Sequence, residues 1–439
     1  GATASLAFRR RSGRRGNELL GSAPPFGVLI DSRTAVEPMQ RPSRRDLLIA
    51  GSSLLAGCSR LPGDGDVGGS ESEGDDTGGV ESESDESRGS GPEITERYPS
   101  WQYDWQNSGA AVDVSAPQQR PSLLWEREIG PGNGGATPVI ADGTAFVGNG
   151  DSTFYALDAA SGEPNWTAGT GKWIHSTAAI DGEFLAFGCD DFRVRAFHTD
   201  GTERWTYTAD FEISSDPVLT DELVIVTDTD GLVYAIERET GDAAWTRTLE
   251  TDSSGHMYSP ALGPERLYVG NHDTTWALSP DDGSTVWSTD DDRPVGGSHA
   301  VVDGRIVGVT FAGFGEERGT VHALDPQTGA VQWFHELDQQ YPSDAAVVEE
   351  TVYVSDPDGL AARSASDGTV KWRVQLGGGC GTPVVADGTV YVGSSSGIHA
   401  IDTDGTIRWK TDAVTGDAGI AIASGTIFTK QEERLYALQ

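Results

Sequence analysis

The residues of this 439-residue chain that could bind a ligand are histidines and aromatic side chains in short polar segments. His175, His256 and His299, with Trp173 and Tyr258, would share a ligand or metal only if the fold brought their segments together. They lack the local spacing typical of zinc ligands, so a metal site is not predicted. Polar loops around a water-filled channel would also collect such residues without any binding function.

Two aspartate pairs carry the oxygen ligands that calcium prefers, Asp228/Asp230 and Asp356/Asp358. Each lies in an Asp-x-Asp-Gly sequence, which also suits a plain turn. We favour the turn. The chain has no Cys-x-x-Cys-His haem motif, and we identify no Ser/His/Asp triad. We therefore predict no catalytic residue, no metal and no cofactor.

The charge balance is strongly acidic, with 31 Lys and Arg against 68 Asp and Glu and a formal net charge of −37. Nucleic-acid binding is not expected, because it depends on clustered basic residues. The composition is typical of a protein adapted to concentrated salt, as in archaeon-like cells that have no outer membrane.

The first part of the chain has the pattern of a processing signal. "SRRDLL" (43–48) resembles a twin-arginine export signal with Arg44 and Arg45, and "LAGC" (55–58) resembles a lipoprotein cleavage box ending at Cys58. We expect residues 1–38 to be an over-extended, unstructured N-terminus and residues 39–58 to be the signal peptide. Lipidated Cys58 would then anchor the chain to the outer face of the cytoplasmic membrane.

Residues 59–97 are almost entirely Gly, Ser, Asp and Glu, so we expect a disordered acidic tether. The folded part is then 98–439, which contains a repeat of about 40 residues, the length of a four-stranded propeller blade. Three turn signals divide each repeat into four short β-forming runs, which predicts an antiparallel meander. Eight tryptophans share one register: Trp125, Trp166, Trp205, Trp245, Trp287, Trp333, Trp372 and Trp409.

The repeats predict an all-β, eight-bladed β-propeller of four-stranded antiparallel blades. The first tryptophan, Trp125, has no third strand before it, and the last third strand, around Tyr436, has no tryptophan after it. The N-terminal strand should therefore complete the C-terminal blade and close the ring, leaving no free sheet edge. Cys189 and Cys380 fall in distant blades, so we predict two unpaired thiols.

The Tyr-Ala-Leu-Asp-x-x-x-Gly-x-x-x-Trp unit resembles the repeat of the PQQ-like β-propellers, which include quinoprotein alcohol dehydrogenases and BamB-type lipoproteins. "YPSWQYDWQNSGAA" (98–111) is similar to the Trp-rich segment that precedes such propellers. The resemblance implies that the eight tryptophans dock neighbouring blades. It also implies the cofactors PQQ and calcium if the chain is an enzyme, although the adjacent Cys-Cys pair of those enzymes is missing.

One end of the ring should carry the function, because its loops enter the first strands and join the second strands to the third. The fifth repeat has an insertion there, "VTFAGFGEERGTVHAL" (309–324), which would bind a partner or cover the channel. The candidate ligand or partner residues on this face are Lys172, Trp173, His175, His256, Tyr258, His272, His299, Phe311, Phe314 and Arg318.

Two functions follow as hypotheses. The first is a monomeric, membrane-tethered, non-catalytic scaffold that binds a protein or peptide on this face, as the resemblance to BamB-type lipoproteins implies. It would contact the membrane only through its lipid anchor. The second is a PQQ-dependent dehydrogenase that oxidises alcohols or sugars.

The acidic composition predicts that the fold loses stability in dilute buffer. At about 1 M salt, repulsion between carboxylates is screened beyond about 3 Å, whereas dilute buffer leaves it unscreened. Thermal unfolding followed by circular dichroism should give a higher midpoint in concentrated KCl. Equal midpoints in both buffers would contradict the prediction.

Overall fold

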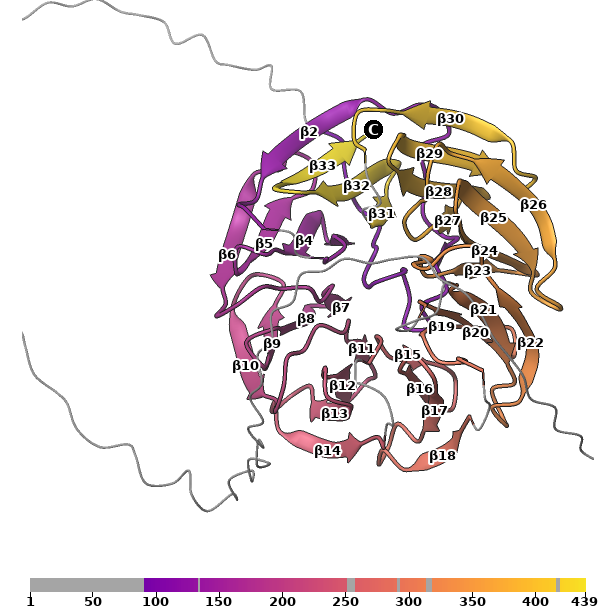
Figure 1. Cartoon of the computed structure of the whole chain (residues 1–439). Coiled ribbons are helices and arrows are strands. Elements are labelled where there is room, and N and C mark those ends of the chain that lie inside the picture. Colours follow the sequence, from indigo (N-terminus) through magenta and orange to yellow (C-terminus); the bar gives the residue numbers. More distant parts are fainter. Residues whose placement is uncertain (1–90, 133–134, 251–256, 290–292, 313–317, 416–418) are drawn as a thin grey trace, which may run out of the picture. The chain divides into compact units, whose positions relative to one another are not determined.

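The computed structural model describes residues 91–439 except 133–134, 251–256, 290–292, 313–317 and 416–418. Within these ranges all regular elements are β-strands, arranged as eight sheets. Figure 1 shows the sheets following one another around a ring. The predicted all-β, eight-bladed propeller is confirmed. No helix in the described part of the chain is long and apolar enough to cross a membrane.

The first four blades each contain four strands that follow one another in the chain. Their bounds are β3 (Val139–Ala141), β4 (Thr144–Gly148), β5 (Thr153–Asp158) and β6 (Pro164–Gly169); β7 (Ala179–Asp181), β8 (Phe184–Cys189), β9 (Arg193–His198) and β10 (Glu203–Thr208); β11 (Val218–Leu219), β12 (Leu223–Thr227), β13 (Leu232–Glu237) and β14 (Ala243–Thr248); β15 (Ala261–Leu262), β16 (Leu267–Gly270), β17 (Thr275–Leu278) and β18 (Thr285–Ser288).

The remaining blades continue the pattern, except that the last blade takes its outer strand from the N-terminal side. Their strands are β19 (Ser298–Val302), β20 (Arg305–Thr310), β21 (Thr320–Leu324) and β22 (Val331–Glu336); β23 (Ala346–Val348), β24 (Thr351–Asp356), β25 (Gly359–Ser364) and β26 (Val370–Gln375); β27 (Val384–Ala386), β28 (Thr389–Ser394), β29 (Gly397–Asp402) and β30 (Ile407–Thr411); β31 (Ile420–Ala423), β32 (Thr426–Gln431), β33 (Arg434–Leu438) and β2 (Leu123–Glu128).

Burial follows the position of a strand within its blade. All six residues of β8 are buried because neighbouring blades cover both faces of a second strand, whereas the outer strand β14 is largely exposed. The hairpin between β3 and β4 turns through Asp142 (φ 48°) and Gly143 (φ 72°). A two-residue hairpin turn needs two consecutive residues with positive φ. Asp303–Gly304 and Asp387–Gly388 repeat this pattern in two other blades.

The eight tryptophans join each blade to the next. Each lies on an outer strand, and its indole Nε1 donates a hydrogen bond of 2.8–3.1 Å to a backbone carbonyl outside its own blade. Seven acceptors lie in the turn after the third strand of the following blade. The pairs are Trp125 to Ala159, Trp166 to Thr199, Trp205 to Arg238, Trp245 to Pro280, Trp287 to Pro326, Trp333 to Ala365 and Trp372 to Thr403. The eighth, Trp409, donates to Pro117 in the segment before β2.

The glycine of each Gly-x-x-x-Trp element provides the socket for the preceding blade's indole. A Cβ built on Gly162 (φ 72°) would lie 2.7 Å from the ring of Trp125. The other six motif glycines also have positive φ, and their Cβ atoms would lie 2.5–3.0 Å from the tryptophan of the preceding blade. Each element therefore receives one tryptophan and, four residues later, supplies the next.

Ring closure by the N-terminal strand follows from the strand pairing. β2 pairs antiparallel with β33, with Trp125 opposite Ala437 and Glu126 opposite Tyr436. The prediction that closure leaves no free sheet edge is wrong, however. Every blade's outer strand is paired on one side only. In each blade with a Gly-x-x-x-Trp element, the pairing of the third and outer strands shifts register just before the tryptophan, as between Ala156 and Leu157. Such bulges discourage edge-to-edge pairing.

The Trp-rich segment before the propeller crosses the ring and bonds to its inner strands. In order, the backbone of residues 98–115 bonds to Ile140, Ile180, Leu262, Val301, Val347 and Val385 in six inner strands and to Gly425 in the turn between β31 and β32, at 2.7–2.9 Å, so seven blades are contacted. Trp105 packs against the clusters of the third and fourth blades. Part of the segment, β1 (Ala110–Ala111), adds a parallel fifth strand to β27. The segment thus links the inner ends of the whole ring.

Replacing Gly162 with alanine should destabilise the propeller more than the same change at Gly304. Both glycines have φ of 72°, but only the Cβ at Gly162 meets an indole, while nothing lies within 4 Å at Gly304. Both variants place an alanine in the left-handed conformation, which lowers the free energy of unfolding by about 1–2 kcal/mol. Overpacking should cost Gly162→Ala about 1–3 kcal/mol more. Chemical denaturation in concentrated salt measures the difference, and equal losses would contradict the socket role.

Candidate functional site

The loops that enter the first strands and those that join second to third strands meet at one end of the ring, here called the loop face. Ile174 N donates to Asn149 O at 3.2 Å, and Gly171 N donates to Asp191 Oδ2 at 2.9 Å. Residues 98–115, which include the Trp-rich segment, contact the opposite end, where Gly425 in the turn between β31 and β32 donates its N–H to Ser115 O. The loop face is therefore not covered by that segment.

Lys172, Trp173 and His175 lie together in the loop that enters the second blade. Lys172 Nζ is 2.9 Å from Glu212 Oε1, and the indole of Trp173 lies 5.8 Å from the imidazole of His175 at a steep angle. His175 Nδ1 accepts from Gly135 N at 3.2 Å, and its Nε2 lies 3.5 Å from Asp190. The structure therefore brings three of the predicted residues together on one rim of the ring.

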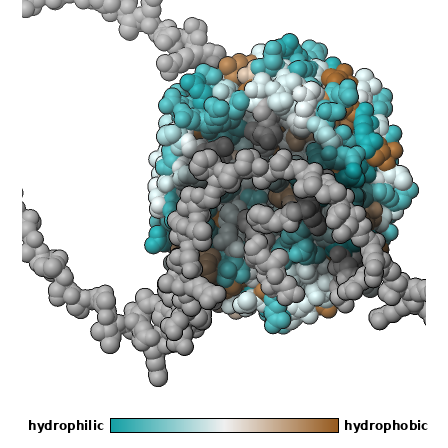
Figure 2. Space-filling view, viewed as in Figure 1, coloured by the Kyte–Doolittle hydropathy of each residue, from teal (hydrophilic) through white to brown (hydrophobic). Residues whose placement is uncertain are grey.

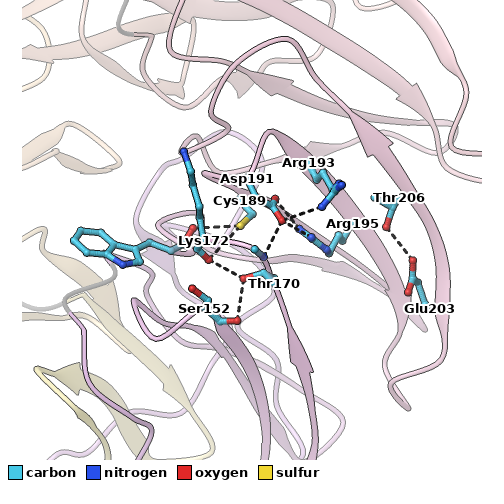
Figure 3. A network of polar contacts seen from close by, with 11 residues as sticks. Ser152, Thr170, Lys172, Cys189, Asp191, Arg193, Arg195, Glu203 and Thr206 are labelled. Carbon is cyan, nitrogen blue, oxygen red and sulfur yellow. Dashed lines mark hydrogen bonds and ion pairs between the residues drawn. The ribbon is translucent and has the colours of Figure 1, made fainter. Parts of the chain in front are cut away.

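A buried polar network holds this loop in place (Figure 3). Asp191 accepts two hydrogen bonds from Arg195, at 2.5 and 3.0 Å, while the Cys189 thiol donates to the carbonyls of Lys172 and Trp173. Burial favours neutral Asp191, but the bonds from Arg195 and Gly171 N outweigh it and lower the pKa of Asp191 to about 2. The network fixes the backbone beneath Trp173.

Cys189 and Cys380 are both free and buried, which confirms the predicted unpaired thiols. Asp228 Oδ1 accepts from the backbone of Asp230 and Leu232, at 3.0 and 2.9 Å, so it closes a turn as we favoured. Among the residues that the structure describes, no three His, Cys, Asp or Glu side chains are grouped as metal ligands would be.

Tyr258, His272 and Phe311 form a second group, over the fourth and fifth blades. The rings of Tyr258 and Phe311 are 5.6 Å apart, and His272 Nε2 lies 2.9 Å from Phe311 O. Burial raises the pKa of Tyr258. Phe311 is also 6.4 Å from Tyr341. Arg318 is exposed and forms ion pairs with Glu336 and Asp338 at 3.3 and 3.6 Å.

Other predicted residues do not contribute to the described surface. His299 is 1% exposed, because it lies in the inner strand β19, where the consecutive residues His299, Ala300 and Val301 are all buried. Its Nε2 lies 2.8 Å from Thr275 Oγ1, and burial lowers its pKa to about 3. His299 is thus a core residue, unlike its prediction. His256 and Phe314, with Arg44, Arg45 and Cys58, lie outside the described residues.

The exposed aromatic residues gather on the loop face. Eight large hydrophobic side chains of the described residues are exposed, and four of them are aromatic: Trp173 (53%), Phe192 (37%), Phe211 (40%) and Tyr341 (76%). All four lie in entry loops or in loops between second and third strands. Figure 2 shows a mostly hydrophilic surface interrupted by separate hydrophobic patches. Phe192, Phe211 and Tyr341 were not among the candidate residues predicted from the sequence, because their exposure in the folded loops, and not their residue type, distinguishes them.

A ring of polar residues at the start of the inner strands was also missed. Six of its members lie two residues before a first strand, and Ser298 begins one, so the shared register was a signal in the sequence. Backbone N–H groups donate to the side chain of the next blade's member: Thr137 to Thr177 at 3.0 Å, Thr177 to Asp216 at 2.5 Å and Asp216 to Ser259 at 2.9 Å. The members are Thr137, Thr177, Asp216, Ser259, Ser298, Asp344 and Thr382.

Two carboxyl groups give this polar ring its chemical character. The Asp216 residue is partly exposed, but its carboxyl group is enclosed by protein. This burial raises the pKa of Asp216 to about 7, although hydrogen bonds from Thr177 and Ser259 favour the anion. Burial also raises the pKa of Asp344, whose carboxyl accepts a hydrogen bond from Ser298. The ring combines hydroxyl groups with two weakly acidic carboxyls and contains no basic side chain.

Asp216 should make the fold less stable as the pH rises. Folded Asp216 keeps its proton to a pH of about 7, whereas an unfolded aspartate loses it near pH 4, so the folded state binds more protons between these values. Stability from this group therefore falls from pH 4 to 7 and stays lower above. The unfolding midpoint of Asp216→Asn should rise relative to the unaltered chain from pH 4 to 8. A difference independent of pH would contradict this.

Comparison with known proteins supports the fold and places the chain in a family. A family model described as "Outer membrane protein assembly factor BamB" matches residues 110–199, 173–303, 271–379 and 317–439. The chain is 24% identical over 269 residues to the protein of that name from Burkholderia pseudomallei, covering 57% of this chain and 68% of that one. It is 23% identical to the Yersinia pestis protein, covering 65% and 79%.

Solved structures with the same fold include two functional classes. BamB from Moraxella catarrhalis superposes with a TM-score of 0.61 at 16% identity, over 73% of this chain and 99% of that one. The quinohemoprotein alcohol dehydrogenase from Comamonas testosteroni also gives 0.61, at 13% identity, over 78% and 80%. At these identities the structures show only the fold. With eight blades, their repeated Gly-x-x-x-Trp elements and the family model across 110–439, the chain belongs to the PQQ-like β-propeller repeat family of BamB type.

Proposed function

We propose that this protein is a membrane-tethered, extracytoplasmic scaffold that binds a protein or peptide partner on its loop face and catalyses no reaction. The observation that carries the proposal is the gathering of four exposed aromatic side chains on that face. Exposed aromatics are costly in water and are enriched where proteins dock. The rigid network under Trp173 supports the same role, because anchors held in place lose little entropy on binding.

The relatives support a partner-binding role in general terms. Those named above are called outer membrane assembly factors. The acidic composition of this chain is typical of cells that have no outer membrane, so we carry over partner binding and not the assembly of outer-membrane proteins. The tether rests on Arg44, Arg45 and Cys58 and the acidic segment 59–97, which together would export the chain and lipidate it at the outer face of the cytoplasmic membrane.

The alternative is a dehydrogenase that uses PQQ and calcium. The inner polar ring fits that quinone poorly, because PQQ carries three carboxylate groups and the ring offers Asp216 and Asp344 with no Lys or Arg. The two ring carboxyls, whose pKa values are raised by burial, supply no positive charge to balance the carboxylates of PQQ. Stoichiometric uptake of PQQ with calcium, followed by dye reduction with an alcohol or sugar, would overturn the scaffold proposal.

The scaffold proposal is tested by recovering a partner from the protein's own membranes in concentrated salt. The loop-face variant Trp173→Ala/Tyr341→Ala is compared with a perimeter variant, Val286→Ser/Ile407→Ser, whose side chains are similarly exposed (49% and 42%) on β18 and β30. Recovery should fall about tenfold or more with the loop-face variant only, because losing an aromatic anchor typically costs about 2 kcal/mol.

The two variants also provide the outcome that would contradict the proposal. An equal loss with both variants would indicate general destabilisation and not docking at the loop face. No reproducible partner with the unaltered chain would count against the scaffold function itself. Unfolding midpoints of both variants are measured in parallel to separate the two effects.

A further inference from the structure

Phe192 occupies a backbone position that suits glycine. It directly precedes β9 and has φ of 67°. The corresponding residues before β5 and β13 are Ser152, with φ of 67°, and Gly231, with φ of 93°. The loop between second and third strands therefore needs a left-handed residue there. Glycine adopts that conformation freely, whereas a bulky side chain crowds its own backbone.

Burial does not offset the strain at Phe192, because its side chain is 37% exposed. The loop backbone is fixed on both sides, since Phe192 N donates to Cys189 O at 3.1 Å and Phe192 O accepts from Ala209 N at 2.7 Å. A strained, exposed aromatic residue on a fixed loop does not serve folding. Such residues cluster at functional sites.

Phe192 lies over Lys172, and two further exposed aromatics, Trp173 and Phe211, adjoin the Lys172–Glu212 ion pair in the chain. Lys172 Nζ lies 4.9 Å from the centre of the Phe192 ring and pairs with Glu212, the neighbour of Phe211 in the chain. Trp173 follows Lys172 and is half exposed. Figure 3 shows the Lys172 side chain directed away from the buried cluster of Asp191 and Arg195. We call Trp173, Phe192 and Phe211, with Lys172 and Glu212, the second-blade patch.

We infer that the second-blade patch is the docking site for a partner segment that carries apolar side chains flanked by lysine or arginine. This inference rests on the proposed scaffold function and names the partner's chemistry. The aromatics supply the apolar surface, and the charge of the patch selects the flanking residues. Lys172 is already paired with Glu212, and Arg193, next to Phe192 in the chain, is paired with Asp191. Asp190, which acts electrostatically on Lys172, and exposed Asp210, next to Phe211 in the chain, leave an excess of negative charge.

The wider charge of the chain points to the same partner. With 68 Asp and Glu against 31 Lys and Arg, the charged groups that a partner segment meets at contact are mostly carboxylates. At 1 M salt, charges separated by more than about 3 Å are screened from one another, so only ion pairs in direct contact contribute to binding. The apolar contacts should then supply most of the affinity and the carboxylates most of the choice between partners.

The test uses labelled short peptides and the full chain in concentrated KCl, with binding followed by fluorescence anisotropy. One peptide alternates Phe with Lys, a second alternates Phe with Glu, and a third alternates Ser with Lys. The Phe/Lys peptide should bind about tenfold or more tighter than either of the others. Phe192→Gly should weaken its binding about tenfold while the unfolding midpoint stays equal or rises, because glycine relieves the backbone.

Ile407→Ser is the matched control, since Ile407 is a similarly exposed hydrophobic residue (42%) on the outer strand β30, away from the loop face, and it should leave binding unchanged. Equal binding of the Phe/Glu peptide, or no effect of Phe192→Gly, would overturn the inference. So would self-association of the chain that Phe192→Gly abolishes, because the occupant would then be a second copy. If these fail while a membrane partner is still recovered and lost with Trp173→Ala/Tyr341→Ala, the scaffold function stands and the patch assignment does not.

Discussion

The hydrogen bond from a tryptophan Nε1 to the backbone of the next blade is the interaction on which the ring depends. It joins neighbouring blades, and the motif glycine makes room for the indole ring because it has no side chain. Each element both receives and supplies a tryptophan, so an error in one blade would be passed to its neighbour. This repeated contact sets the positions of the loops. Residues from neighbouring repeats can therefore meet on one face, as Gly135 does with His175, whose other ring nitrogen lies 3.5 Å from Asp190.

The two ends of the ring are built differently, and this difference separates stability from function. At one end, residues 98–115 bond to the inner strands of six blades and to a turn of the eighth, and leave little room for variation. At the other end, the loops carry exposed aromatics and a strained phenylalanine over a bonded network that keeps them rigid. A scaffold needs this arrangement, because a partner gains affinity from anchors that are already in place.

The blades were predictable because their determinants are local and recur in register. Gly162 and Trp166 lie four residues apart in the chain, and their spacing survives in seven repeats. His299 was misplaced because a polar side chain in that segment was taken for a loop residue, whereas the other blades have a buried proline or alanine at the same register, such as Pro217 and Ala345. The bonds of the Trp-rich segment could not be predicted, because backbone hydrogen bonds leave no pattern in side-chain types. Asp216 and Asp344 share a register that was visible in the sequence, whereas the exposure of Phe192 and Phe211 depends on the folded loops.

The crossing of the Trp-rich segment has a consequence for the order of folding. β2 pairs with β33, and the segment before it bonds to blades from the first to the eighth, so the earliest part of the propeller contacts its latest part. Contacts between distant parts of a chain form slowly, because loop closure must precede them. Seven blades can stack on their neighbours as they emerge, but the ring locks only when the last has formed. The ring is therefore completed by the part of the chain that is made first, because β2 and the segment before it can pair fully only after the last blade has formed.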